Sequence, residues 1–375
     1  MRLTDLETPA LLLDRAQLDR NIARMRAQLG RLGGVSLRPH LKTAKSIDVA
    51  RQVLPEGGPI TVSTLLEAER FGEAGFTDIL YAVGIAPNKL DRVIALRRRG
   101  IDLTIVTDNV EAAEAVAVAA REAGEVLPVL IEIDSDDHRA GVRPDQPDLL
   151  VAIARALSDG AVVRGVMTHA GGSYEARDSA ELVRIAAQER DSAVACATTL
   201  RDVGFPAPVV SVGSTPTALS AADLAGVTEV RAGVYLFFDL VMAGIGVATL
   251  DEIALSVLTT VIGHQRDKGW ILVDAGWMAM SRDRGTASQA VDQGYGLVCD
   301  AAGNPFADLV MVSANQEHGI LSIREGSSTP LPDLPFGTQL RILPNHACAT
   351  AAQFGEYQVI EDSAVVARWP RFNGW

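Results

Sequence analysis

Short β-branched apolar runs alternate with longer helical stretches along the first 240 residues. Eight such runs occur, at residues 36–42, 60–64, 78–83, 103–107, 128–134, 162–170, 209–214 and 229–236. The longest stretch between them, at 178–203, has Leu182, Ile185, Ala186 and Val194 at helical spacing. Strands separated by helices pair in parallel through right-handed crossovers. Eight such units predict a closed (β/α)8 barrel of the TIM type, with an open α/β sheet as the alternative.

After residue 240 the apolar runs follow one another without helical stretches between them. They lie at 253–263, 270–274, 295–299, 309–312, 339–343, 357–360 and 365–369, and turn residues separate them. This pattern is typical of a mainly antiparallel β domain. We therefore expect an α/β barrel domain over residues 1–245, whose first few residues pack on the second domain, and a β domain over 246–375.

Charge and composition narrow the possible partners. The 375 residues include 34 basic and 47 acidic side chains, a formal charge of −13, which argues against nucleic acid or an anionic membrane as a partner. Three cysteines are too few for a disulfide framework. The amino terminus is charged too early for a signal peptide, and no apolar run reaches about 18 residues. We expect a soluble cytoplasmic protein.

The segment after the seventh run, SVGSTPT at 211–217, has features of a phosphate site. Gly213 permits close backbone approach, and Ser214 and Thr215 offer hydroxyl and N–H groups at the start of a helix. In a barrel of this type, phosphate binds at the loops after strands seven and eight. Gly233 and Tyr235, after the eighth run, complete the predicted cradle. A plain capped helix start is the alternative.

The first run ends in RPHLKTAK at 38–45, which places a lysine at the barrel mouth. Alternation puts Arg38, His40 and Lys42 on one face of the strand, whereas Lys45 lies past its end and is expected on the surface. Desolvation lowers the pKa of a lysine in such a place, which suits Schiff-base chemistry. A lysine together with a phosphate cradle makes pyridoxal 5′-phosphate the leading cofactor, with Lys42 as its attachment point.

Other strand ends supply further candidates. Arg139, after the fifth run, is predicted to face the pyridine nitrogen of the cofactor, and His169 and Tyr174, after the sixth, are predicted to contact its ring. The acidic run at 134–137 is either a solvated loop or a metal site.

In the second domain, His346 and Cys348 stand two positions apart, so on an extended segment both face one cation. Histidine and cysteine together favour Zn²⁺ or another borderline metal. Glu317 and His318 are candidates for a third ligand or for an outer partner. The alternative is a buried cysteine beside a structural histidine.

Six motifs occur in the order seen in one enzyme family: RPHLKT, GSTPT, VRAGVY, DAGWMAMSRD, QEHG and PNHACAT. From Thr8 to Trp375 the chain resembles the fold-type III pyridoxal-phosphate enzymes of the D-serine dehydratase and D-threonine aldolase group. The resemblance implies an alanine-racemase-like barrel, a cofactor on Lys42, and a divalent metal (Zn, Mn, Mg or Co) on His346 and Cys348. D-Threonine aldolases of the group typically have aspartate where this chain has Cys348, which points to the dehydratase branch.

That branch implies the removal of water from a D-β-hydroxy-α-amino acid, with D-threo-3-hydroxyaspartate as the expected substrate and oxaloacetate and ammonia as products. Arg143, Arg282 and Arg284 are candidates for binding the β-carboxylate, and the metal is another. The alternatives are retro-aldol cleavage at the same site, D-serine dehydration, racemisation and non-catalytic cofactor carriage. The resemblance also implies a homodimer.

Overall fold

The computed structural model describes residues 1–362 and 364–375, and the chain divides into two compact units. The barrel unit comprises Arg24–Gly233 with Gly374–Trp375, and the sheet unit comprises Met1–Ala23 with Val234–Asn373. The predicted domain boundary at 245/246 stays a prediction. Outside position 363, the structure contains no helix that is long and apolar enough to cross a membrane.

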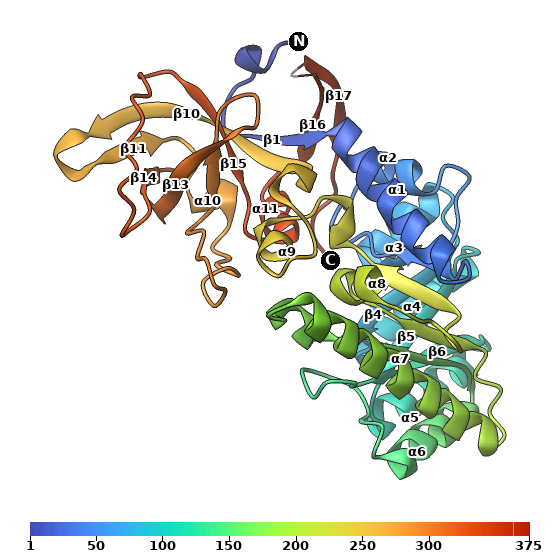
Figure 1. Ribbon diagram of the computed structural model, residues 1–375. Helices are drawn as coiled ribbons and strands as arrows, with labels where there is room; N and C mark the ends of the chain where they lie inside the picture. The colour runs from blue at the N-terminus through green and yellow to red at the C-terminus, as the bar shows by residue number, and fades with distance from the viewer. Residues whose placement is uncertain (363) are drawn as a thin grey trace. The chain divides into compact units, whose positions relative to one another are not determined.

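Eight parallel strands form the centre of the barrel unit (Figure 1). They are β2 (Ser36–Pro39), β3 (Ile60–Val62), β4 (Asp78–Gly84), β5 (Asp102–Thr107), β6 (Leu127–Ile133), β7 (Ala161–Thr168), β8 (Val209–Val212) and β9 (Glu229–Ala232). Their order is β2-β9-β8-β7-β6-β5-β4-β3, and a single parallel bridge between His40 and Thr61 joins the end of β2 to β3. The barrel is thus nearly closed, which confirms the predicted barrel and excludes the open sheet.

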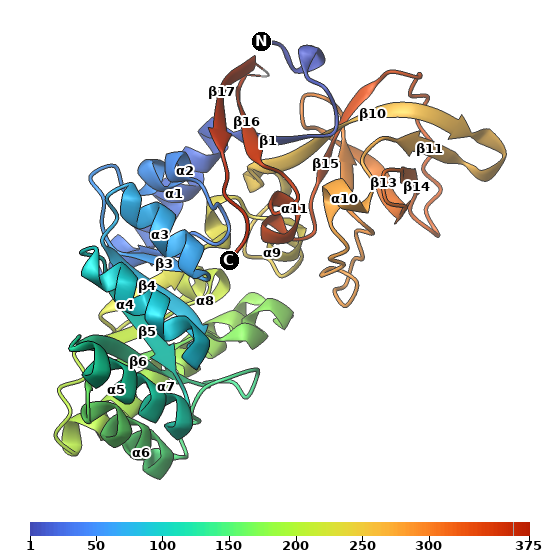
Figure 2. The same ribbon diagram turned by 180° about the vertical axis from the view of Figure 1, so that it is seen from behind.

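Helices surround these strands, as Figures 1 and 2 show for α4 to α7. The bounds are α1 (Arg15–Arg31), α2 (Ile47–Val53), α3 (Leu65–Glu73), α4 (Leu90–Arg98), α5 (Val110–Ala123), α6 (Pro147–Ser158), α7 (Ser179–Asp202) and α8 (Thr215–Ser220), with 3-10 turns η2 (Pro87–Lys89) and η3 (Gly171–Glu175). Local sequence sets their ends. Asn109 Oδ1 accepts the N–H of Ala112 at 2.8 Å to start α5, and Gly124, at φ 63°, ends it.

A chain of polar contacts runs through the barrel interior. Arg38 pairs with Asp78 at 2.7 Å and with Glu229 at 2.8 Å. Glu229 accepts the Ser211 hydroxyl at 2.6 Å, and the same hydroxyl accepts Arg231 Nη1 at 2.6 Å. Arg231 also donates to the carbonyl oxygen of Thr168. Each buried charge therefore has partners, which is the condition for tolerating charges in a core.

The sheet unit contains nine strands. They are β1 (Ala10–Asp14), β10 (Leu255–Gln265), β11 (Trp270–Val273), β12 (Leu297–Cys299), β13 (Pro305–Ala314), β14 (Gly319–Ile323), β15 (Gln339–Leu343), β16 (Glu356–Glu361) and β17 (Ala364–Pro370). Their order is β11-β14-β13-β12-β15-β10-β1-β16-β17, and β11 also pairs with β10, so six of them close into an antiparallel barrel. Figure 2 shows β10 and β11 as a long hairpin. The predicted β domain is confirmed.

Two strands of this sheet were not expected from the sequence, β1 and β14. Strand β1 pairs antiparallel with β10 and parallel with β16, so the sheet is not wholly antiparallel. Its residues Leu11, Leu12 and Leu13 are at most 1% exposed, so both faces are covered and the run has no polar alternation. The short helical elements here are η1 (Leu3–Asp5), η4 (Val234–Leu236), α9 (Leu240–Gly244), η5 (Leu250–Glu252), η6 (Arg266–Lys268), α10 (Trp277–Met280) and α11 (Ala347–Ala351).

Candidate active site

Lys42 lies in a turn directly after the carboxyl end of β2. The strand ends at Pro39, so the prediction of a strand continuing to residue 42 is wrong. His40 makes only the bridge to β3, and the chain then turns, which leaves the Lys42 side chain exposed at the barrel mouth. The position at a strand end is the one where barrel enzymes carry reactive groups.

Lys45 is not the surface residue that the sequence suggested. Its side chain is 16% exposed, and its ammonium pairs at 3.0 Å with Glu67, whose side chain is 1% exposed. Glu67 also accepts the hydroxyls of Ser63 at 3.0 Å and Thr64 at 3.1 Å. Lys45 has a φ of 45°, in the left-handed region. The pair therefore fixes the far end of the turn that carries Lys42.

Two histidines are held neutral beside Lys42. Burial, and then the charge of Lys42, lower the pKa of His169 to about 3. Burial, followed by the charges of Lys42 and Arg231, holds the pKa of His40 well below its usual range. His40 and Lys42 follow β2, His169 follows β7, and Arg231 lies on β9. Because their charges affect one another's pKa, the carboxyl ends of these three strands lie close together, as predicted for a barrel site. The Tyr174 ring lies 6.1 Å from that of His169, centre to centre.

Arg139 lies on the loop after β6. Its guanidinium is 3.6 Å from Glu132 Oε1, and its charge also contributes to the lowered pKa of His169. Burial raises the pKa of Glu132, although Arg139 and Arg231 act in the opposite direction. The structure therefore places Arg139 near His169, while its predicted contact with the pyridine nitrogen stays a prediction.

The predicted phosphate loop is also a capped helix start. A Cβ atom on Gly213, at φ 131°, would overlap the carbonyl oxygen of Arg231, so the position requires glycine. Ser214 Oγ accepts the N–H of Thr217 at 3.2 Å, and Ser214 N donates to Thr217 Oγ1 at 3.0 Å. A Cβ on Gly233 would lie 2.7 Å from the carbonyl oxygen of His40, so this position is also confined to glycine.

The remaining predicted cradle residues lie in different units. Thr215 is buried in the barrel unit at the start of α8. Tyr235 belongs to the sheet unit, where its side chain is completely buried. The contribution of both residues to cofactor binding stays a prediction.

The acidic run at 134–137 shapes its own loop. Asp134 Oδ1 accepts the N–H groups of Asp136 at 3.3 Å and His138 at 3.2 Å, and Asp136 Oδ2 accepts the N–H of Gly172 at 2.7 Å. In the part of the chain that the structure describes, no three His, Cys, Asp or Glu side chains gather as a metal site. The metal interpretation of this loop is therefore not supported.

His346 and Cys348 lie at the start of α11 in the sheet unit. His346 Nδ1 is 2.7 Å from Asp283 Oδ2, and Asp239 accepts the N–H of Ala347 at 2.9 Å. Burial acts to lower the pKa of His346, but Cys348, Asp283 and Asp239 together raise it to about 11. A site that attracts a proton this strongly has the charge that favours a bound cation. A histidine whose other nitrogen contacts a carboxylate is also the usual arrangement of a metal ligand.

Glu317 and His318 are not part of this arrangement. Both are exposed between β13 and β14, and within residues 1–362 and 364–375 they form no metal-binding group with His346 and Cys348. Asp283 occupies the role of outer partner that was considered for them. The interpretation of Glu317 and His318 as ligands is therefore not supported.

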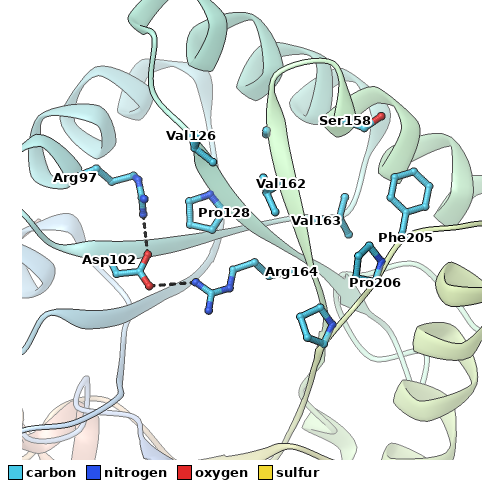
Figure 3. Close-up of a pocket in the computed structure, with 12 residues that line it drawn as sticks. Arg97, Asp102, Val126, Pro128, Ser158, Val162, Val163, Arg164, Phe205 and Pro206 are labelled. Atoms are coloured by element: carbon cyan, nitrogen blue, oxygen red, sulfur yellow. Dashed lines mark hydrogen bonds and ion pairs between the residues drawn. The ribbon is translucent and has the colours of Figure 1, made fainter.

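A hollow of about 500 Å³ lies at the opposite end of the barrel strands (Figure 3). There Asp102 pairs with Arg97 at 3.0 Å and with Arg164 at 3.1 Å, beside an apolar wall that includes Val162 and Phe205. Asp102 is the first residue of β5, whereas the candidate site residues follow the strands' carboxyl ends. This hollow is not the candidate active site.

Comparison with known proteins identifies the family of the chain. Residues 13–241 match the family described as alanine racemase, N-terminal domain, and residues 254–360 match the putative serine dehydratase domain. The chain therefore belongs to the family that the first of these matches describes, since that match covers more than half of its residues. It is 55% identical to D-threo-3-hydroxyaspartate dehydratase of Delftia sp. (strain HT23), over 100% of this chain and 99% of the relative.

More distant members of the family share the full length. D-Serine dehydratase of Dictyostelium discoideum is 29% identical, over 100% of this chain and 98% of its own. 3-Hydroxy-D-aspartate aldolase of Paracoccus denitrificans (strain Pd 1222) is 28% identical, over 98% and 92%.

Solved structures show the same architecture. The Delftia dehydratase superposes with a TM-score of 0.97, covering 100% of both chains. An alanine racemase of Clostridium difficile 630, at 15% identity, has a TM-score of 0.67 over 96% of this chain and 98% of its own, which shows the fold alone. The Delftia enzyme was also solved as a histidine-to-alanine variant and, in the metal-free form, as a cysteine-to-alanine variant.

Sequence reasoning missed several residues that shape the site. Asp283 stands in the DAGWMAMSRD motif, but nothing in the sequence pairs it with His346. Glu189 occupies the apolar stripe of α7 with Leu182, Ala186 and Ala193. A charged residue in such a stripe was the one available signal, because burying it requires partners.

Proposed function

We propose that this protein is a pyridoxal-phosphate-dependent lyase that removes water from D-threo-3-hydroxyaspartate, giving oxaloacetate and ammonia. The observation that carries the proposal is the full-length identity of 55% to an enzyme named for that reaction. Lys42, at the barrel mouth beside two neutral histidines, supports it, because an amine in such surroundings is suited to holding an aldehyde cofactor.

The barrel unit offers a donor set that fits this cofactor. Lys42 would carry it, His169 and Tyr174 would contact its ring, and Arg139 would approach its nitrogen. Ser214 would contact the phosphate from the start of α8, where its Oγ accepts the N–H of Thr217 and also lies 2.9 Å from Ser173 Oγ. When bound, pyridoxal phosphate withdraws electrons from the Cα atom of an amino acid and so acidifies its proton.

We also propose a metal site that is formed by His346 and Cys348, here called the metal pair. His346 and Cys348 would hold a divalent cation, with Asp283 orienting the imidazole, and the cation would act as a Lewis acid on the β-hydroxyl of the substrate. The two variants solved for the Delftia enzyme replace a histidine and a cysteine two positions apart, as His346 and Cys348 are here. That spacing supports the assignment.

Of the three arginines considered for the β-carboxylate, Arg282 fits best. Arg143 pairs with Asp145 at 3.2 Å, and Arg284 pairs with Asp292 at 2.7 Å. Arg282 stacks on Trp277 at 4.2 Å and has no ion-pair partner among the described residues. It also directly precedes Asp283, the partner of His346, so its charge is available close to the metal pair.

Product analysis tests the proposed reaction. The purified protein, supplied with pyridoxal phosphate and Mn²⁺ or Zn²⁺, is incubated with D-threo-3-hydroxyaspartate. We expect oxaloacetate with equimolar ammonia, loss of both products in Lys42→Ala, and full activity in Lys268→Ala, a surface lysine that stacks on Trp270. Glycine with glyoxylate would establish the aldolase instead, and turnover of D-serine alone would establish a D-serine dehydratase.

A further inference from the structure

Helix α7 presents one carboxylate to the barrel. Its buried stripe consists of Leu182, Ala186, Glu189, Ala193, Cys196, Ala197 and Leu200. Glu189 is 2% exposed, and it is the only charged residue in that stripe. Neither the reaction nor the cofactor contacts described above use it.

The carboxylate of Glu189 joins two loops of the site. Its Oε1 atom accepts the N–H of Ala170 at 2.9 Å and the N–H of Gly213 at 3.1 Å. Ala170 directly follows His169 on the loop after β7, and Gly213 directly precedes Ser214 on the loop after β8. One oxygen atom of Glu189 therefore holds together the loop that carries His169 and the loop of the predicted phosphate cradle.

The carbonyl group of the same residue, Gly213, determines the tautomer of His169. His169 Nδ1 lies 3.1 Å from the carbonyl oxygen of Gly213. A carbonyl oxygen only accepts hydrogen bonds, so Nδ1 has to carry the proton. Because His169 is neutral at ordinary pH, its Nε2 atom then holds the lone pair. Glu189 fixes the Gly213 N–H, and Gly213 in turn directs the imidazole.

We propose that Glu189 is a positioning residue of the cofactor site, which ties the loops after β7 and β8 together and keeps His169 in the Nδ1-protonated form. The cofactor part of this inference rests on the proposed function. The tautomer part does not, because it concerns only contacts within the barrel unit.

The surroundings of Glu189 explain why an acceptor is needed at this place. Two buried N–H groups converge on one oxygen, and leaving both without an acceptor would carry the full desolvation cost. Burial raises the pKa of Glu189, while Thr217, the two N–H groups and the charge of Arg231 act against that rise. Since two N–H groups are satisfied by one oxygen, an uncharged amide of the same shape can replace the carboxylate.

Three variants test the inference. Glu189→Gln keeps an acceptor oxygen at the same reach, and Glu189→Asp keeps the charge but withdraws it by one methylene. Leu182→Ala is the matched control, because it removes a large apolar side chain from the same buried stripe of α7 and leaves the carboxylate of Glu189 in place. Each is measured as the apoprotein in two ways. Titration with pyridoxal phosphate gives the cofactor Kd, and nitrogen-15 NMR of the imidazoles gives the His169 tautomer.

We expect Glu189→Gln to bind the cofactor within about threefold of the wild type and to keep His169 protonated at Nδ1. Glu189→Asp should bind about tenfold more weakly or worse, with a mixed or reversed tautomer. Leu182→Ala should retain the wild-type tautomer and affinity. The chain has six histidines, so a His169→Gln spectrum assigns the resonance.

The inference is overturned if Glu189→Asp keeps the wild-type tautomer, or if Leu182→Ala loses as much affinity as Glu189→Asp does. A wild-type protein that fails to bind pyridoxal phosphate at all would refute the proposed function. The tautomer measurement would still decide the role of Glu189, since it needs no cofactor.

Discussion

His169 connects the charge state of the site to the stability of the fold. Its pKa is about 3 in the folded protein, well below its ordinary value. Between that ordinary value near 6.5 and the folded value, the unfolded chain binds a proton that the folded chain does not. Stability therefore falls as the pH drops below about 6.5, by up to about 1.4 kcal/mol per pH unit for this residue.

We expect His169→Gln to reduce this loss. Urea unfolding at pH 7.5 and pH 5.5 should show a smaller decrease in the free energy of unfolding for the variant than for the wild type. His318→Gln, at an exposed position, is the control. An identical pH dependence in the wild type and in His169→Gln would contradict the buried, neutral state of this histidine.

The three cysteines should differ in reactivity. Burial raises the pKa of Cys196 to about 11 and that of Cys299 to about 12, so both thiols are protonated and inaccessible at neutral pH. Cys348 is partly exposed. After chelation, a thiol reagent should modify one cysteine per native chain, three per denatured chain, and none at native Cys348 once Zn²⁺ is restored. Labelling of Cys348 that is indifferent to Zn²⁺ would argue against the metal pair.

Arg282 should determine the preference for a substrate with a β-carboxylate. Replacing it by alanine removes an exposed cation that stacks on Trp277 but has no ion-pair partner among the described residues, so the fold is little affected. We expect KM for 3-hydroxyaspartate to rise at least about tenfold, because a charge-assisted contact is lost, while KM for D-serine changes little. Arg143→Ala serves as the control, and an equal rise in that variant would reassign the contact.

At the scale of single residues, the sequence indicated side chains with distinctive chemistry better than it indicated their partners. Motifs and strand ends are the basis on which Lys42, His169 and the His346–Cys348 pair are predicted, and these roles stay predictions. The contact between Asp283 and His346 joins positions 63 residues apart in the chain, and no local pattern encodes it. The prediction that Lys45 lies on the surface was wrong for the same reason, since its partner Glu67 lies on α3, beyond the intervening helix α2.

The turn between β2 and α2 is held at its far end by the ion pair between Lys45 and Glu67. Lys45→Met leaves the buried carboxylate of Glu67 without its cation, and we expect a loss of about 3 kcal/mol in the free energy of unfolding. The double variant Lys45→Met with Glu67→Gln should recover most of that loss. Denaturant unfolding of both variants measures it, and additive losses would show that the two residues act independently.

At the scale of elements, the pattern of apolar runs and turn residues along the chain predicted most of the strands. The eight barrel strands and most of the second sheet follow from apolar runs bounded by turn residues. Strand β2 ends earlier than its apolar run because the chain turns after His40, and this turn carries Lys42. Strand β1 escaped prediction because both of its faces are buried in the sheet.

For the whole molecule, the predicted assembly is a homodimer. Light scattering coupled to size exclusion should give twice the chain mass of 39.8 kDa, for the protein with and without its cofactor. A mass of 39.8 kDa across a tenfold range of concentration would contradict the prediction.

Strand β1 has a consequence for the order in which the protein matures during synthesis. Residues 10–14 are synthesised before the barrel strands, whereas their partners, Leu255–Leu258 on β10 and Gln358–Ile360 on β16, are synthesised after them. All eight barrel strands are made in between. The segment ALLL therefore stays apolar and without either neighbouring strand until β10 has been synthesised. A ribosome that stalls between residues 233 and 254 releases a chain whose barrel strands are complete but whose first strand lacks both neighbouring strands and is exposed to chaperones and proteases.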